Sequence, residues 1–352
     1  MTQPSQDGSL FDRFADGEAG PEEVARINDL LEHDDLRNRV MSLWNANNTF
    51  SFDRVDWPRL GNAATITTVS RYMKHIMWNM GLNPLVISNG IPKRLLKKVS
   101  EEKAERVRKA LNDCLILTKI ARWDPDKRWN MAVEAVARLK SKGHRVSLVA
   151  RGGMESHGAE VLDNARTVGL QVKEVECSGD GLDDRLRAIE AAGPADILNL
   201  KFFMPEDLSR LIYYASDGVL ANSGHEPFGL VGLETMAAGG VAFTGCTGED
   251  YAVPLENAIV LETDDPEEIV EYVTYLEEHA DEKDRIRKAA RRTARQYTWE
   301  QVVTNLVSKL DYLVRHKGIQ LGVAPSNGNG NGSLPQAHKA DWSTAFQYPT
   351  PA

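Results

Sequence analysis

The sequence predicts an α/β protein built on a doubly wound parallel sheet, and three observations support this. Short apolar runs alternate with helical stretches between residues 113 and 262. Several runs are apolar throughout, which is typical of strands buried on both faces of a parallel sheet. Because crossovers between parallel strands are right-handed, the repeated strand–helix order leaves helices on both faces. The predicted strands are 115–121, 145–150, 170–176, 195–200, 218–222, 240–245 and 257–262.

The stretches between these runs have helical periodicity. The first, WNMAVEAVARLKSKG, repeats apolar residues at helical spacing and ends at Gly143, a common helix stop. Three further helices are predicted at 206–216, 230–240 and 265–280. Open α/β sheets bind ligands beyond the carboxyl ends of their strands, so functional residues should lie in the loops after the apolar runs.

The flanking segments follow a thinner pattern. Residues 64–81 read as a strand entering a helix, and 85–92 (LVISNGIP) as an Asn-Gly turn closed by Pro92, which we interpret as a hinge. Residues 283–297 form a basic amphipathic helix whose charge should balance the acidic helix before it. A last helix is predicted at 299–316, and another before residue 45.

Composition narrows the class of protein. The chain has 352 residues, 42% hydrophobic and 26% charged, with a net charge of −9. These values predict a soluble protein of about two domains. No apolar run is long enough to span a bilayer, and the start MTQPSQDGSLFDRF lacks a basic flank and a small-residue cleavage site, so we expect a cytoplasmic protein without a transmembrane segment or signal peptide. The acidic excess argues against binding nucleic acid or anionic membranes.

The cysteines do not suggest a metal centre. Cys114, Cys177 and Cys246 lie far apart in or beside apolar runs, so we expect buried, reduced thiols and no metal site.

Two loops carry candidate binding residues. After the run 115–121, Arg122 and Lys127 precede a helix, and cations beside a helix N-terminus favour a diphosphate; two solvated surface cations are the alternative. After the run 218–222, Glu226 and Glu234 lie eight residues apart. Carboxylates accept hydrogen bonds from sugar hydroxyls, so Glu226 would meet a hexose and Glu234 a ribose. The alternative is one glutamate that stabilises the helix dipole and one solvated glutamate.

Glycines mark two places where a ligand can approach the backbone. Phe228, Gly229 and Leu230 open the helix after Glu226. The pair Gly152-Gly153 follows the run 145–150 and is a further candidate for ligand binding, although a tight strand-to-helix turn explains it more simply.

These motifs resemble those of the retaining glycosyltransferases of family 4, which have the GT-B fold. The resemblance rests on Arg122…Lys127, SGHEPFGLVGLE and TTVSRYMKHIMWNMGLNPLVISNGIP, and covers roughly residues 64–316. It implies a Rossmann-like donor domain at 87–298, a partial N-terminal acceptor-side lobe at 1–86, a crossover helix at 299–317 and a disordered tail at 318–352.

The resemblance also implies roles for the site residues. Arg122 and Lys127 would grip the donor diphosphate, Glu226 the transferred sugar, Phe228 to Leu230 the sugar and phosphate, and Glu234 the ribose. The implied reaction is metal-independent sugar transfer with retention, from a nucleotide-diphosphate-sugar to an acceptor hydroxyl, with no other cofactor.

The chain departs from the family pattern in two places. No Gly-rich loop occurs before residue 60, and Thr247-Gly248-Glu249-Asp250-Tyr251 replaces the usual Gly-Gly-x-x-Glu loop. Because the resemblance implies that most of the N-terminal lobe is absent, the alternatives are a non-catalytic nucleotide-sugar-binding protein or one subunit of a split enzyme, completed by a second polypeptide. A sugar epimerase or a phosphorylase is a third alternative.

Overall fold

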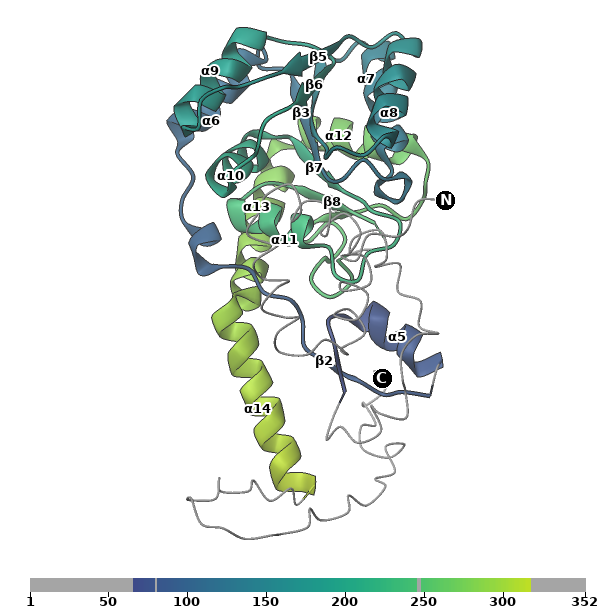
Figure 1. Ribbon diagram of the computed structural model, residues 1–352, viewed down its shortest axis with the longest axis vertical. Coiled ribbons are helices and arrows are strands. Elements are labelled where there is room, and N and C mark those ends of the chain that lie inside the picture. Colours follow the sequence, from purple (N-terminus) through teal and green to yellow (C-terminus); the bar gives the residue numbers. More distant parts are fainter. Residues whose placement is uncertain (1–65, 80, 246–247, 318–352) are drawn as a thin grey trace, which may run out of the picture. The chain divides into compact units, whose positions relative to one another are not determined.

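The main feature of the computed structural model, which describes residues 66–79, 81–245 and 248–317, is a parallel sheet. Its seven strands follow the order β5-β6-β4-β3-β7-β8-β9, and Figure 1 labels β5, β6, β3, β7 and β8 in that succession. Each apolar run becomes one strand, which confirms the predicted α/β class. The strands are β3 (Leu115–Ile120), β4 (Val146–Arg151), β5 (Val172–Val175), β6 (Ile197–Leu200), β7 (Gly218–Ala221), β8 (Ala242–Thr244) and β9 (Ile259–Val260).

Helices cover both faces of this sheet (Figure 1), because alternate residues of each strand point to opposite sides. Leu117 packs with one helical layer and Ile116 with the other. The first layer holds α7 (Trp129–Ser141), α8 (His157–Thr167) and α12 (Pro266–Glu278). The second holds α6 (Glu101–Ala110), α9 (Leu182–Ala192), α10 (Glu206–Ala215), α11 (Leu230–Ala238) and α13 (Ala280–Ala294).

Helix ends follow local chemistry. The Ser100 hydroxyl accepts a hydrogen bond from the Lys103 amide at the start of α6, and the Asp265 carboxylate caps α12 just before Pro266. Gly143 ends the α7 segment with φ 92°, as the sequence predicts for a helix stop.

The segments that flank the sheet region form smaller elements. Strands β1 (Thr67–Thr68) and β2 (Leu85–Val86) pair in parallel around α5 (Arg71–Asn79), as the predicted strand and helix require. The 3₁₀ turns are η2 (Lys93–Leu96), η3 (Pro125–Lys127) and η4 (Arg295–Tyr297), and the last helix is α14 (Trp299–Lys317). The predicted helix before residue 45 and the predicted tail after 317 lie outside the described residues.

The predicted Asn-Gly turn does not form. Asn89 and Gly90 carry no turn and no positive φ, and the Ile91 backbone instead bridges to Thr298. Its amide donates to the Tyr297 carbonyl at 2.8 Å, and its carbonyl accepts from Trp299 at 3.0 Å. Tertiary pairing satisfies the backbone groups that a local turn would have used.

Contacts divide the chain into Met1–Ala64 and Thr65–Ala352, and all described residues lie in the second unit. The boundary expected at residues 86 and 87 remains a prediction.

The basic helix α13 binds backbone carbonyls and a buried carboxylate rather than the acidic helix before it. Arg287 donates to the carbonyls of Tyr214 and Ser216 at the end of α10, where the helix dipole is negative. Lys283 pairs with Asp217. The α13 charges therefore secure the end of α10 and the start of β7.

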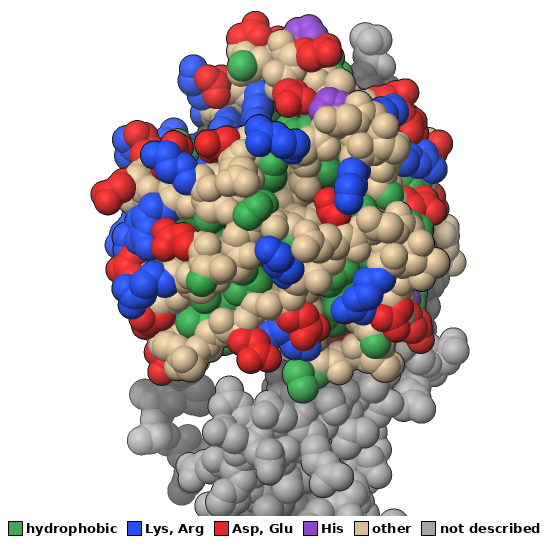
Figure 2. All heavy atoms as spheres, turned by 90° about the horizontal axis from the view of Figure 1, so that it is seen from above, with side chains coloured by type: hydrophobic (Ala, Val, Ile, Leu, Met, Phe, Trp, Pro, Cys, Tyr) green, Lys and Arg blue, Asp and Glu red, His purple; other side chains and the backbone are tan. Residues whose placement is uncertain are grey.

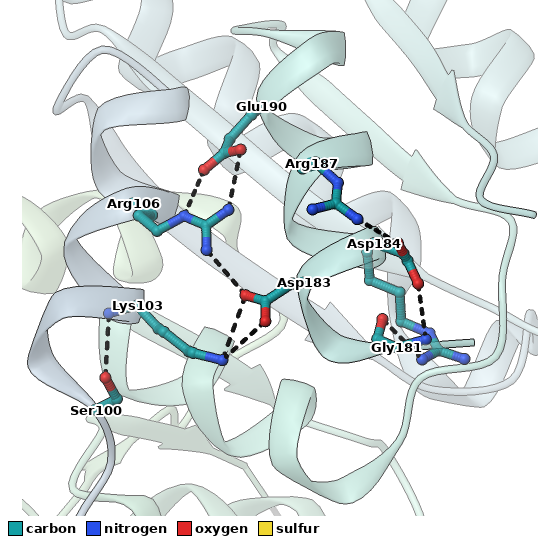
Figure 3. A network of polar contacts seen from close by, with 9 residues as sticks. Ser100, Lys103, Arg106, Gly181, Asp183, Asp184, Arg187 and Glu190 are labelled. Carbon is teal, nitrogen blue, oxygen red and sulfur yellow. Dashed lines mark hydrogen bonds and ion pairs between the residues drawn. The ribbon is translucent and has the colours of Figure 1, made fainter. Parts of the chain in front are cut away.

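Charged side chains of both signs lie on the surface of the sheet region. Acidic and basic groups are interspersed over the face shown in Figure 2. Between α6 and α9, Arg106 holds Glu190 with two hydrogen bonds and also contacts Asp183 (Figure 3). These pairs are exposed to solvent, so each contributes little to stability.

Asp217, just before β7, is a buried carboxylate with several partners. It accepts a hydrogen bond from the Ile116 amide at 2.8 Å and pairs with Arg108 and Lys283. Burial raises the pKa of Asp217, but the two cations and the amide outweigh burial and hold the pKa below its ordinary value.

We predict that Asp217→Ala lowers the free energy of unfolding at pH 7 by about 3 kcal/mol, because two partly buried cations lose their partner. A depressed carboxyl pKa stabilises the fold above the ordinary pKa and loses that contribution as pH falls through the folded value. Urea unfolding should therefore show the deficit shrinking below about pH 4. Asp163→Ala, at an exposed pair with Arg166, should change the free energy by less than about 1 kcal/mol. An equal effect of both variants would contradict the prediction.

Candidate functional site

Two loops meet at the carboxyl edge of the sheet because β3 and β7 are neighbours there. Leu117 pairs with Gly218 and Thr118 with Val219, so the loops after both strands emerge side by side.

Hydrogen bonds lock these two loops together. The Gly224 amide donates to the Asp126 carbonyl at 2.8 Å, and the His225 amide to the Asp126 carboxylate at 2.9 Å. A Cβ at Gly224 would lie 2.9 Å from Asp126 Oδ1, so a larger residue would displace the carboxylate that accepts from His225.

A cavity of about 270 Å³ opens between the loops, and four of the predicted residues line it: Arg122, Lys127, Glu226 and Gly229. Lys127 Nζ lies 3.3 Å from Glu226 Oε2, and both side chains are largely shielded from solvent. Arg122 is about half exposed, at 53%. The described lining residues carry one carboxylate against several cations, a balance that favours an anionic ligand. The lining residues are Lys119, Ile120, Ala121, Arg122, Lys127, Leu220, Ala221, Ser223, Glu226, Gly229 and Val231.

The N-terminus of α11 faces this cavity. Gly229 precedes the helix with φ 79°, a conformation that favours glycine, and it lines the cavity together with Val231. No side chain caps this end, and the first turn contains no acidic residue. The backbone N–H groups that begin at Leu230 are therefore available to an anion.

Phe228 lies in the core rather than in the cavity. Its ring is buried and lies 5.5 Å from the Tyr251 ring and 6.2 Å from the Tyr297 ring. The Tyr251 hydroxyl donates to the Gly229 carbonyl. Phe228 therefore fixes the start of α11, and only its backbone remains for a ligand.

Glu234 lies apart from the residues that line the cavity, and no group of residues 66–79, 81–245 or 248–317 donates a hydrogen bond to it. Burial, with a smaller contribution from Glu206, raises the pKa of Glu234 to about 7. A partly buried carboxylate without protein donors can accept hydrogen bonds from ligand hydroxyls.

Gly152 and Gly153 also lie outside the cavity lining. A Cβ at Gly152 would be 1.9 Å from the Trp123 indole nitrogen, and one at Gly153 would be 2.4 Å from the Glu155 carboxylate. The Glu155 carboxylate accepts a hydrogen bond from the Trp123 amide at 3.0 Å. Both glycines thus make room for groups that hold the Arg122 loop, and their contact with a ligand remains a prediction.

Two cations that the sequence analysis did not single out belong to this region. Lys119 lines the cavity from within β3, and Arg128 precedes α7 with φ 53° and pairs with Asp264 at 2.6 Å. The sequence offered one signal for Lys119, a lysine near the end of the apolar run 115–121. The strained φ of Arg128 has no signal in the sequence.

A larger cavity of about 610 Å³ lies between α5, β2 and α14. Asp250, from the segment after β8, lines it and accepts hydrogen bonds from Arg71 at the start of α5. Its described lining carries the cations Arg71, Lys74 and Lys309 against the carboxylate of Asp250, a cationic excess like that of the smaller cavity. It does not lie at the carboxyl ends of β3 and β7, where the predicted site residues meet.

Within the described ranges, no cluster of three or more His, Cys, Asp or Glu side chains could hold a metal ion. None of the helices in the same ranges is long and apolar enough to cross a membrane.

Comparison with known proteins identifies the family. The family model "Glycosyl transferases group 1" matches residues 79–293, more than half of the chain, so the chain belongs to this family. A sequence search of curated proteins finds no match.

Solved glycosyltransferase structures share the fold. Anabaena Alr3699/HepE, solved with UDP and glucose, is 17% identical and matches with a TM-score of 0.56 over 71% of this chain and 64% of that one. Sucrose-phosphate synthase from Thermosynechococcus elongatus is 18% identical, with a TM-score of 0.54 over 76% and 64%. A glycosyltransferase from Rickettsia africae is 16% identical, with a TM-score of 0.53 over 71% and 64%. The chain spans less than two thirds of these structures.

We predict that Glu234→Gln stabilises the ligand-free protein at pH 8 by about 1–3 kcal/mol and leaves stability unchanged near pH 4.5. A carboxyl pKa raised to about 7 means that the folded state binds the extra proton between pH 4.5 and 7, so the charge destabilises the fold as pH rises. Urea unfolding at the two pH values measures this. Glu278→Gln, at an exposed end of α12, is the control, and equal effects at pH 8 would refute the prediction.

Proposed function

We propose that this chain is a retaining glycosyltransferase of family 4, which transfers a sugar from a nucleotide-diphosphate-sugar to an acceptor hydroxyl. The observation that carries the proposal is the cavity in which Lys127 and Glu226 lie 3.3 Å apart beside the open N-terminus of α11. Cations and free amides suit a diphosphate, and a carboxylate suits sugar hydroxyls.

The cationic groups would act on the leaving group. As the bond between the sugar and the diphosphate breaks, negative charge grows on the phosphate oxygens. Arg122, Lys127 and the amides from Leu230 onward would hold that charge more strongly in the transition state than in the ground state, which is the condition for accelerating the step.

Retention rests on the family resemblance. The acceptor hydroxyl would attack the sugar on the face that the diphosphate leaves, and its proton would pass to a departing phosphate oxygen. Glu226 would hold the sugar hydroxyls during this exchange. Glu234, with its raised pKa, would accept hydrogen bonds from the ribose hydroxyls as a carboxylate.

A second candidate is a donor-binding protein that is inactive alone, either non-catalytic or the donor subunit of a split enzyme. The observation that favours it is the span of less than two thirds of the structures that share the fold. Catalysis needs an acceptor held in near-attack geometry, which a second polypeptide would supply. Turnover that begins only when this polypeptide is added would distinguish the two candidates.

We predict that Glu226→Ala lowers the release of nucleoside diphosphate from the donor sugar more than about 100-fold, while binding of the nucleoside diphosphate changes less than about threefold. Loss of Glu226 removes the contact to the sugar and the ion pair with Lys127, but no direct contact to the diphosphate. Calorimetry with UDP, ADP and GDP and their sugars first identifies the donor, and a coupled assay then measures release.

Arg122→Ala tests the diphosphate assignment separately. It should weaken binding of the nucleoside diphosphate about tenfold, the worth of one charge-assisted hydrogen bond. Arg166→Ala, on the exposed surface of α8, is the matched control. Unchanged binding in the Arg122 variant would refute the assignment of Arg122 to the diphosphate.

Metal independence is a further expectation, because cationic side chains and helix amides would carry the charge that a divalent ion carries elsewhere. Activity should be unchanged by an excess of EDTA followed by gel filtration, and a loss that Mg²⁺ or Mn²⁺ restores would overturn this expectation.

A further inference from the structure

Lys119 is a buried lysine at the edge of the candidate site. It lies near the carboxyl end of β3, is 1% exposed, and lines the same cavity as Arg122 and Lys127. Its strand position gives it the same face as Leu117, so its stem packs toward α7, and Nζ lies 5.7 Å from the centre of the Trp129 ring.

The amine has two neutral acceptors. Nζ donates to the Leu220 carbonyl at 3.1 Å and to Asn222 Oδ1 at 2.7 Å, both near the carboxyl end of β7. Across the part of the chain that the structure describes, no carboxylate lies within ion-pair distance of Lys119. A neutral amine has two N–H bonds and an ammonium three, so the two acceptors match the neutral form.

The charged neighbours disfavour a second positive charge here. Burial, together with the cations Lys127 and Arg128 and against a smaller opposite effect of Glu226, lowers the pKa of Lys119 to about 7. Lys127, from η3, already pairs with Glu226, from the loop after β7. The Lys119 amine is therefore uncharged in part of the molecules at neutral pH, and it can become a cation by taking up a proton.

We propose that Lys119 is a further binding residue for the diphosphate of the ligand, and that its amine takes up one proton from solvent when the ligand binds. This rests on the proposed function, since it requires a diphosphate in the cavity. The ligand would supply the acceptor for the third N–H and the negative charge that offsets Lys127 and Arg128. The Trp129 ring would stabilise the resulting cation.

Proton uptake distinguishes this role from a purely structural one. A structural Lys119 that only ties β3 to β7 keeps the same protonation state with and without ligand. If Lys119 binds the diphosphate as an ammonium, the affinity for the nucleoside diphosphate falls as pH rises above neutrality, because binding is coupled to uptake of a proton whose concentration falls.

The experiment is calorimetry of UDP binding to the full chain at pH 8, in Tris and in HEPES, whose ionisation enthalpies differ. ADP and GDP replace UDP if UDP does not bind. UDP itself is fully ionised at this pH. We expect uptake of about one proton per ligand at pH 8 and about one half at pH 7.

Variants assign that proton. Lys119→Met should abolish the uptake and weaken binding about tenfold at pH 7. His225→Gln, at an exposed histidine beside Asp126, should leave the uptake intact. Glu234 would release a proton if it ionised on binding, so it cannot mimic uptake. The measurement on the unchanged protein does not depend on the folding of any variant.

The outcomes separate the two proposals. Nucleoside diphosphate binding without proton uptake, or uptake that persists in Lys119→Met, overturns the role of Lys119 and leaves the donor site standing. Absence of binding by all three nucleoside diphosphates overturns the proposed function and this inference together.

Discussion

The parallel pairing of β3 with β7 is the constraint on which the candidate site depends. Parallel strands end at the same edge of a sheet, so this pairing alone places the loop of Arg122 and Lys127 beside the loop of Glu226. The hydrogen bonds from Gly224 and His225 to Asp126 then fix the two loops to each other. If β3 and β7 were not neighbours in the sheet, Arg122 and Lys127 would lie apart from Glu226 and the cavity between their loops would not form.

Packing beneath the loops explains how a polar site remains rigid. The Trp123 ring lies against Gly152 and stacks near Trp129, whose indole donates to the Arg122 carbonyl. On the other side, the rings of Phe228 and Tyr251 hold the start of α11. These groups sit in the core and leave the backbone of α11 and the long cationic side chains to face the cavity. Apolar contacts in the core therefore set the positions of the charges, and salt does not weaken these contacts as it weakens ion pairs.

Two ionisable groups of this region, Lys119 in β3 and Glu234 in α11, lack an ion-pair partner among the described residues. Glu234 and Lys119 both have a pKa of about 7, one raised and the other lowered by burial. Each reduces the stability of the ligand-free protein when charged, and each gains from a ligand that offers the missing partner. Ionisable groups with shifted pKa values are common at functional sites. A site whose polar groups lack protein partners favours the ligand that supplies those partners and disfavours analogues that do not.

The sequence by itself determined the seven strands, because runs buried on both faces are apolar throughout, and it located Arg122, Lys127 and Glu226, because ligands bind where parallel strands end. Tertiary structure decided what depends on partners distant in the chain. The predicted Asn89-Gly90 turn does not form because Ile91 pairs with Thr298, and Arg287 of α13 bonds the end of α10 instead of the acidic helix before it. In the sequence Lys119 is an ordinary strand residue, and only the structure places its amine beside Asn222 and in the cavity lining. Periodicity records which face of an element is buried, whereas burial, charge and hydrogen bonding at one atom depend on which other elements pack against it.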